Sequence, residues 1–232
     1  MGLFLFWGEF VPPEPTVKRA VAFFDGQNLF HSAREAFGYT YPNYDPLALA
    51  QAICQQQAWD LSETRFYSGI PDQQDNPSWN HFWNAKLAVM GSRGVHTYSR
   101  PLRYRYRTVN LPDGTQFSYM TGHEKGTDVR IALDVIRCTL AGACDVALIF
   151  SQDQDLSEVA DEVRSIAQQQ QRWIKIASAF PVSPTAKNRR GINKTDWIRI
   201  EKSTYDKCLD PNDYRFSIPS PAPAPLRPPA GR

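Results

Sequence analysis

The sequence predicts an α/β fold built on a mostly parallel sheet, and three observations support this prediction. Strand-like and helix-like segments alternate from residue 19 to residue 180, which is typical of a parallel sheet covered by helices on both faces. Two of the strands, residues 21–24 and 146–150, are continuous apolar runs, as expected for strands buried on both sides. With 42% hydrophobic residues in a chain of 232, a sizeable core can be buried.

In the first half of the chain, apolar spacing and capping residues mark each element. A Pro-rich lead-in at 11–18 ends before the first strand, and Gly26 turns the chain into a helix. Asp45 and Pro46 suit the N-cap and first position of a second helix, and Gly91 ends a third. The expected elements are strands at 21–24, 63–70 and 94–100 and helices at 28–37, 45–57 and 77–91.

The pattern changes after residue 102, where residues alternate with a period of two on both sides of a Pro-Asp-Gly turn at 112–114. This pattern predicts a β-hairpin inserted into the α/β alternation. The alternation then resumes with helices at 125–142 and 155–170, strands at 145–150 and 172–180, and a short last strand at 196–203. We therefore expect an N-terminal extension (1–18), one α/β domain (19–205) and a Pro-rich C-terminal tail (206–232).

Bulk properties argue against several classes of protein. No apolar run approaches the ~20 residues of a transmembrane helix, and the first residues lack the basic region of a signal peptide. The four cysteines form no C-x-x-C pair and no zinc-like cluster, so we expect free thiols in a reducing compartment. These features predict a cytoplasmic protein. A formal net charge of +2 does not by itself indicate a nucleic-acid binder.

Carboxylates gather where the predicted strands end. Asp25 ends the first strand, Asp153 and Asp155 follow the strand at 146–150, and Asp128 opens the helix after the hairpin. The carboxyl ends of parallel strands meet at one edge of the sheet, so these acids crowd together if the two strands are neighbours. Two carboxylates about 5 Å apart repel by roughly 3 kcal/mol, and a bound Mg²⁺ or Mn²⁺ offsets that repulsion. The joint placement therefore predicts a metal site.

Each acid also has a structural explanation when taken alone. Asp155, with Glu158 three residues later, fits a capping box. Asp128 fits a helix N-cap, and Asp25 before a glycine fits a turn. Asp134 follows Asp128 by six residues, about 240° around the helix, and is expected to face elsewhere. The metal site is favoured only because the acids occur together at strand ends.

Three sequence blocks resemble a known family. FFDGQNLF, EKGTDVRIALDVI and VALIFSQDQDLSEVADEV, in this order, resemble the blocks of the NYN domain, in the LabA-like branch of the PIN-like nuclease superfamily. The resemblance covers residues 21–163 and implies a Rossmann-like, PIN-like three-layer sandwich with an inserted hairpin. It also implies a metal-dependent ribonuclease that hydrolyses RNA phosphodiester bonds in an acidic pocket holding Mg²⁺ or Mn²⁺. Endonucleolytic cleavage is expected.

Carried over block by block, the resemblance assigns roles to particular residues. It implies that Asp25, Asp128, Asp153 and Asp155 bind the metal and act in catalysis, and that Asn28, a polar neighbour of Asp25, is also a catalytic residue. One departure is visible, because the family's last block often reads S-G-D-x-D and a glutamine, residue 152, stands here in place of the glycine. We therefore expect the shape of this loop, more than the metal site, to differ from the family pattern.

A basic stretch precedes Asp128 and is expected to contact nucleic acid. In SRPLRYRYRTV, alternate arginines share one face of a strand and the tyrosines share the other, where we expect them to pack on the fold. A row of guanidinium groups suits the phosphates of RNA, although ordinary solvated charge is the alternative. A second basic stretch, 187–194, is expected in a loop. The expected contacts are Arg100, Arg103, Arg105, Arg107 and Lys125.

The expected partner is thus RNA, either single-stranded or structured. Binding to a membrane is not expected. A homodimer and a protein partner for the Pro-rich tail are further candidates. The main alternative function is a PIN-like module that binds RNA without cleaving it, against which the intact acids argue. A phosphatase of the haloacid-dehalogenase type would need D-x-D after the first strand, where this chain has Asp-Gly-Gln. The glycine motifs of dinucleotide-binding proteins and P-loop ATPases do not occur.

Overall fold

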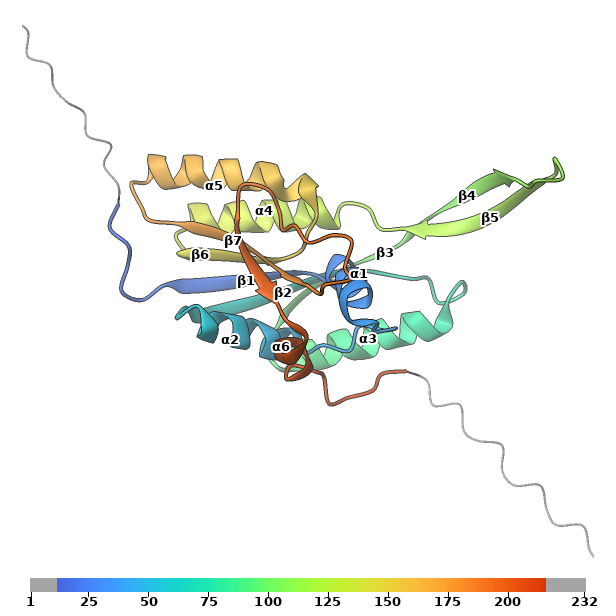
Figure 1. The fold of residues 1–232 in the computed structure, drawn as a ribbon, viewed down its shortest axis with the longest axis horizontal. Coiled ribbons are helices and arrows are strands. Elements are labelled where there is room, and N and C mark those ends of the chain that lie inside the picture. The colour runs from blue at the N-terminus through green and yellow to red at the C-terminus, as the bar shows by residue number, and fades with distance from the viewer. Residues whose placement is uncertain (1–11, 216–232) are drawn as a thin grey trace, which may run out of the picture.

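The computed structural model describes residues 12–215, and six parallel strands form its central sheet (Figure 1). The N-terminal apolar run and the Pro-rich stretch from residue 218 lie outside the described residues. The strands are β1 (Arg19–Asp25), β2 (Asp60–Ile70), β3 (His96–Pro101), β6 (Val146–Phe150), β7 (Lys175–Pro181) and β8 (Asp196–Ile200). Their spatial order is β3-β2-β1-β6-β7-β8, and every neighbouring pair is parallel. This is the strand order of a Rossmann-like fold, as the sequence predicts.

Helices cover both faces of the sheet and complete a three-layer sandwich (Figure 1). On one face lie α4 (Thr127–Leu140) and α5 (Ser157–Gln169). On the other lie α1 (Gly26–Phe37), α2 (Pro46–Gln56), α3 (Pro77–Ser92) and the short α6 (Lys202–Asp206). The predicted caps of α2 are confirmed, since the Asp45 side chain accepts hydrogen bonds from two backbone N–H groups and Pro46 is the first helical residue.

The first strand divides the core into two clusters by simple alternation. Ala22 and Phe24 face the cluster under α1, α2 and α3, whereas Val21 and Phe23 face the cluster under α4 and α5. All four are fully or almost fully buried. Both faces of the central strand are therefore apolar, which explains why it reads as a continuous apolar run.

The hairpin forms as predicted and stands apart from the sheet. Strand β4 (Arg103–Asn110) pairs antiparallel with β5 (Gln116–His123), in register from Arg103 opposite His123 to Asn110 opposite Gln116. The pair forms a separate two-stranded sheet that projects away from the α/β body (Figure 1). Both of its faces are largely exposed to solvent.

Packing continues beyond residue 205, where the α/β domain was expected to end. Cys208 and Tyr214 are buried, and Asp210 forms an ion pair of 2.8 Å with the fully buried Lys86 of α3. All four cysteines are buried and unpaired, as predicted. Within residues 12–215, no helix is long and apolar enough to cross a membrane.

Candidate active site

A pocket of about 340 Å³ opens at the carboxyl ends of β1 and β6. These two strands are neighbours, as the crowding of the acids required, and the strand order reverses between them. Ligands of open α/β sheets bind in the crevice at such a reversal. The residues lining the pocket are Asp25, Gln27, Asn28, His31, Glu124, Lys125, Gly126, Thr127, Asp128 and Asp153.

Asp25 is the last residue of β1 and the N-cap of α1. Its Oδ1 accepts a hydrogen bond of 3.0 Å from the backbone N–H of Asn28, and its Oδ2 accepts one of 3.3 Å from the Ser151 hydroxyl. The next residue must be glycine, because a Cβ on Gly26 would lie 2.5 Å from the ring of Phe66. The turn role that the sequence allowed for Asp25 is thus real, and the same side chain also lines the pocket.

The loop after β6 is fastened to Asp25 through Ser151. The Ser151 hydroxyl donates to Asp25 and accepts a hydrogen bond of 3.1 Å from the backbone N–H of Asp153. Asp153 lines the pocket, and its Oδ1 accepts 3.1 Å from the backbone N–H of Asp155. Ser151 therefore sets the spacing between two of the predicted acids.

Asp155 lies outside the pocket wall, on the exposed side of the loop. A 3₁₀ turn, Gln154–Leu156, separates β6 from α5, so α5 begins later than the sequence suggests. Asp153 caps this turn, and α5 starts without a side-chain cap. The capping box that the sequence offered as an alternative role for Asp155 therefore does not form, because the extra turn moves the helix start to Ser157.

Gln152, which replaces the glycine of the family pattern, joins three parts of the site. Its backbone N–H donates 2.9 Å to Asn28 Oδ1, and its side-chain carbonyl accepts 2.7 Å from the Ser32 hydroxyl of α1. Its side-chain amide donates 2.8 Å to the backbone carbonyl of Arg190, in the loop between β7 and β8. Gln152 is not among the described residues with positive φ, so the loop forms without glycine's freedom, and a glycine would lose these side-chain bonds.

The segment between β5 and α4 forms the facing wall. Gly126 adopts φ +78° and is the N-cap of α4, so Asp128 lies in the first turn and is not itself the cap. A Cβ on Gly126 would also lie 2.8 Å from the Arg100 guanidinium, which places Arg100 beside this wall. Lys125 is exposed on the wall. The predicted residues Asp25, Asn28, Lys125, Asp128 and Asp153 therefore share one pocket.

Five pocket residues were not predicted as site residues from the sequence, and two of them, Glu124 and His31, carry titratable side chains. Glu124 directly follows the hairpin and is half-buried in the wall. His31 lies one turn after Asn28 on α1, and this spacing of three residues was an available signal that both face the same way. Asp134 faces elsewhere, as expected, since it accepts hydrogen bonds from the Tyr67 hydroxyl and the Arg130 guanidinium.

Burial, together with neighbouring carboxylates, raises the pKa of two acids in the pocket. Burial raises the pKa of Asp25 from 3.8 to about 7, and the nearby charges of Glu124 and Asp153 act in the same direction. Burial also raises the pKa of Glu124, helped by the charge of Asp128. Negative charge is therefore costly in the pocket, and a bound cation would relieve that cost.

The chemistry of the pocket fits a hard divalent cation. Four carboxylates line it, and two buried oxygens of lining residues, Glu124 Oε1 and Thr127 Oγ1, have no hydrogen bond of good geometry within residues 12–215. Across residues 12–215, no three His, Cys, Asp or Glu side chains converge into a complete metal site. Mg²⁺ typically takes one or two protein carboxylates and completes its shell with waters and substrate phosphates, which this donor set allows.

We expect Asp25→Asn to change how stability depends on pH. The folded protein keeps the Asp25 proton up to about pH 7, whereas the unfolded chain releases it near 3.8. Between these values the wild-type free energy of unfolding falls as pH rises, because the ionised carboxylate is costly to bury. The asparagine cannot titrate, and it retains the cap of α1.

The measurement is urea unfolding in EDTA at about pH 5 and about pH 8. The stability of Asp25→Asn relative to the wild type should rise by more than about 1 kcal/mol between the two conditions. Parallel pH profiles for the two proteins would show that the Asp25 pKa is not raised.

The predicted nucleic-acid residues occupy two places. Arg100 and Lys125 lie beside the pocket, whereas Arg103, Arg105 and Arg107 lie along β4 of the hairpin. The second basic stretch, 187–194, forms the loop between β7 and β8, as expected. Its backbone is held to the site by Gln152 and by Gln154, whose amide donates 3.0 Å to a carbonyl of this loop.

The fold and the pocket define a class of protein: a Rossmann-like α/β protein with an acidic pocket at the reversal of its strand order. The comparison with protein families specifies it further, because the model of the NYN domain matches residues 19–192. The chain belongs to the NYN domain family, a member of the PIN-like nuclease superfamily.

Comparisons with individual proteins add information on the fold alone. No curated protein matches the chain. A crystal structure of a protein of unknown function from Vibrio parahaemolyticus is similar, with 18% identity over 82% of this chain and 97% of that one, and a TM-score of 0.50. A ribokinase structure from Giardia lamblia shares 9% identity over 75% of this chain and 53% of that one, with a TM-score of 0.35. The first supports the fold, and the second is too remote to inform on function.

Proposed function

We propose that the protein is a metal-dependent ribonuclease that hydrolyses RNA phosphodiester bonds in the pocket between β1, β6 and α4. One observation supports this most. Three distant chain segments deliver four carboxylates to a single pocket, in a chain that belongs to a family of the PIN-like nuclease superfamily. The choice of RNA over DNA, endonucleolytic cleavage and membership of the LabA-like branch follow from the sequence resemblance.

Within this proposal, each residue has a role that its contacts support. Asp25 and Asp153 hold Mg²⁺ or Mn²⁺ at a spacing set by Ser151, and Asp128 with Glu124 adds negative charge from the facing wall. When bound, the ion would activate a water molecule and stabilise charge on the leaving oxygen. Asn28 fixes the Asp153 loop through the backbone N–H of Gln152.

The basic residues beside the pocket complete the substrate site. Lys125 is exposed on the pocket wall, and the Arg100 guanidinium lies against Gly126. Both can pair with phosphates on either side of the scissile bond, which holds the strand across the acidic centre. Asp155, outside the wall, is limited in this arrangement to contact through water.

Removing the metal tests the proposal directly. Labelled single-stranded RNA is incubated with the full chain in Mg²⁺, in Mn²⁺ and in EDTA, and then again after metal is returned to the EDTA sample. We expect cleavage with either metal, none in EDTA, and recovery on metal return. Cleavage that persists in EDTA would overturn the metal mechanism. RNA binding without cleavage in every condition would support the alternative function, a PIN-like RNA-binding module.

A further inference from the structure

We propose that one face of the β4–β5 hairpin grips single-stranded RNA, with Phe117 and Tyr119 as a platform on which unpaired bases stack. This face, called here the arginine face, carries Arg103, Arg105 and Arg107 on β4 together with Phe117 and Tyr119 on β5. The inference rests on the proposed function, because it assumes that the acidic pocket receives an RNA strand.

The register of the hairpin places the aromatic rings among the arginines. Arg107 is directly opposite Tyr119, and Val109 is directly opposite Phe117. Residues directly opposite each other in an antiparallel pair project to the same face, and residues two apart along a strand share that face as well. Phe117 and Tyr119 therefore lie on the same face as Arg105 and Arg107.

The two rings form an exposed aromatic surface. Their centroids are 6.0 Å apart and their planes differ by 22°, so they are nearly parallel. Phe117 is 55% exposed and Tyr119 is 38% exposed. Large apolar side chains at such exposure on a projecting arm indicate a binding surface.

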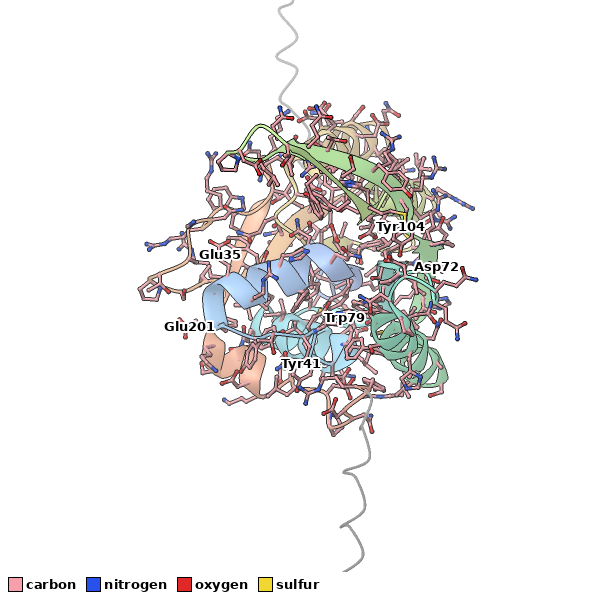
Figure 2. All side chains as sticks on the ribbon, turned by 90° about the vertical axis from the view of Figure 1, so that its right-hand side faces the viewer. Glu35, Tyr41, Asp72, Trp79, Tyr104 and Glu201 are labelled. Atoms are coloured by element: carbon pink, nitrogen blue, oxygen red, sulfur yellow. The ribbon has the colours of Figure 1, made fainter. Side chains whose placement is uncertain are left out.

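The opposite face of the hairpin differs in both charge and attachment. Tyr104 anchors its base, since the backbone N–H of Asp72 donates 2.8 Å to the tyrosine hydroxyl, and Figure 2 shows the two residues close together. Tyr106 is 78% exposed, so the expectation that it packs on the fold is wrong: the hairpin projects too far for the body to reach it. Met120, opposite Tyr106, is 48% exposed. This face bears no arginine.

Charge and ring geometry together favour single-stranded nucleic acid over another protein. Between residues 103 and 123 the only acid is Asp113, in the turn, so the arginine face is strongly positive. A second copy of this face would meet it with like charge, whereas a phosphate backbone complements it. Aromatic platforms beside arginines are how proteins hold unpaired bases, which a duplex would keep stacked internally.

The arginine face leads into the pocket. Strand β5 ends at His123, and the next five residues, Glu124 to Asp128, all line the pocket wall. Eight residues of β-strand extend about 26 Å, enough for several nucleotides. A strand lying along this face would therefore be directed to the acids at the base of the hairpin.

RNA-binding assays that compare substitutions on the two faces of the hairpin test the inference. Fluorescence anisotropy in EDTA follows a labelled single-stranded RNA, and the same RNA paired with its complement, on the full chain carrying Asp153→Asn to prevent cleavage. On this background, Phe117→Ala with Tyr119→Ala is compared with Tyr106→Ala with Met120→Ala. We expect the first pair to weaken single-strand binding at least about tenfold and the second to leave it within about twofold. Duplex binding should be weaker and should respond little to either pair.

The remaining outcomes either overturn the stacking platform or separate it from the proposed nuclease activity. Equal losses from both faces, or no loss from the first pair, would exclude a stacking platform on the arginine face. Wild-type self-association that Phe117→Ala and Tyr119→Ala abolish, without any effect on RNA, would make the face a contact between copies. If Phe117→Ala with Tyr119→Ala weakens RNA binding but the wild type cleaves no RNA with any metal, the platform stands and the nuclease is refuted. If the wild type cleaves RNA but this pair leaves RNA binding unchanged, the nuclease stands and the platform is refuted.

Discussion

Asp153→Asn is expected to lower the rate of RNA cleavage at least about 10³-fold while the fold stays intact. Asp153 faces the pocket from the loop after β6, and Ser151 ties it to Asp25. Losing one proposed metal ligand would remove several kcal/mol of electrostatic stabilisation from the transition state, and each 1.4 kcal/mol is about tenfold in rate. Asparagine keeps an oxygen for the backbone N–H of Asp155, so the 3₁₀ turn remains capped.

Asp155→Asn is the matched control, because it removes the same charge two residues away. Asp155 is exposed and outside the pocket, so we expect its substitution to cost at most about tenfold in rate. Initial cleavage rates of the two variants and the wild type are compared at saturating Mn²⁺, with thermal melting as a check on folding. Equal losses from both substitutions would show that the two acids act as a pair, as the sequence resemblance alone implies. An unimpaired Asp153→Asn would remove this loop from the mechanism.

The second large effect concerns stability, and Asp210→Ala is expected to lower the free energy of unfolding by about 3–5 kcal/mol. Lys86 is fully buried in α3, and its ammonium donates 2.8 Å to Asp210 and 2.7 Å to the backbone carbonyl of Tyr44. The Tyr44 and Tyr214 rings lie 5.6 and 5.2 Å from the ammonium. Without Asp210, a buried positive charge loses its only anionic partner among these contacts.

Urea unfolding measures this effect, and Asp213→Ala is the control. Within residues 12–215, the ion-pair partner of Asp213 is the exposed Arg215 alone, so removing Asp213 should leave the unfolding midpoint unchanged. Burial alone would raise the pKa of Asp210, but the hydrogen bond and charge of Lys86 outweigh it and lower the pKa. The stabilisation from the Lys86–Asp210 ion pair is therefore fully present at pH values above the ordinary pKa of an aspartate. It is lost as the pH falls through the lowered pKa of Asp210. Equal stability of the two variants would show that residues 206–215 do not hold the domain together.

The α/β fold was predictable because the apolar pattern of each strand reflects its burial on both faces. The runs at 21–24 and 146–150 read as buried strands because helices cover them on either side. The sequence suggested that these two strands are neighbours only if the acids at their ends share one site. The parallel pairing of β1 with β6 confirms that they are neighbours. The role of residues 206–215 was not predictable, because the partner of Asp210 lies 124 residues away in the chain.

The site was predictable to the extent that its residues end parallel strands or begin helices. Asp25, Asp128 and Asp153 do so, and all three line the pocket. Glu124 was not found because its position depends on where the inserted hairpin returns to the body, which no periodicity encodes. The linking role of Gln152 was hidden for a similar reason, since its partners Ser32 and Arg190 come from distant segments.

The pocket between β1, β6 and α4 is proposed to hold a divalent cation. Mn²⁺ binding to the metal-free protein can be measured by titration at about pH 8, above the pKa of Asp25, with bound ions counted by electron paramagnetic resonance. We predict that the wild type and Asp155→Asn bind Mn²⁺ and that Asp153→Asn binds it at least about tenfold more weakly. A wild type that binds no Mn²⁺, or an Asp153→Asn variant that binds it as tightly as the wild type, would contradict the claim.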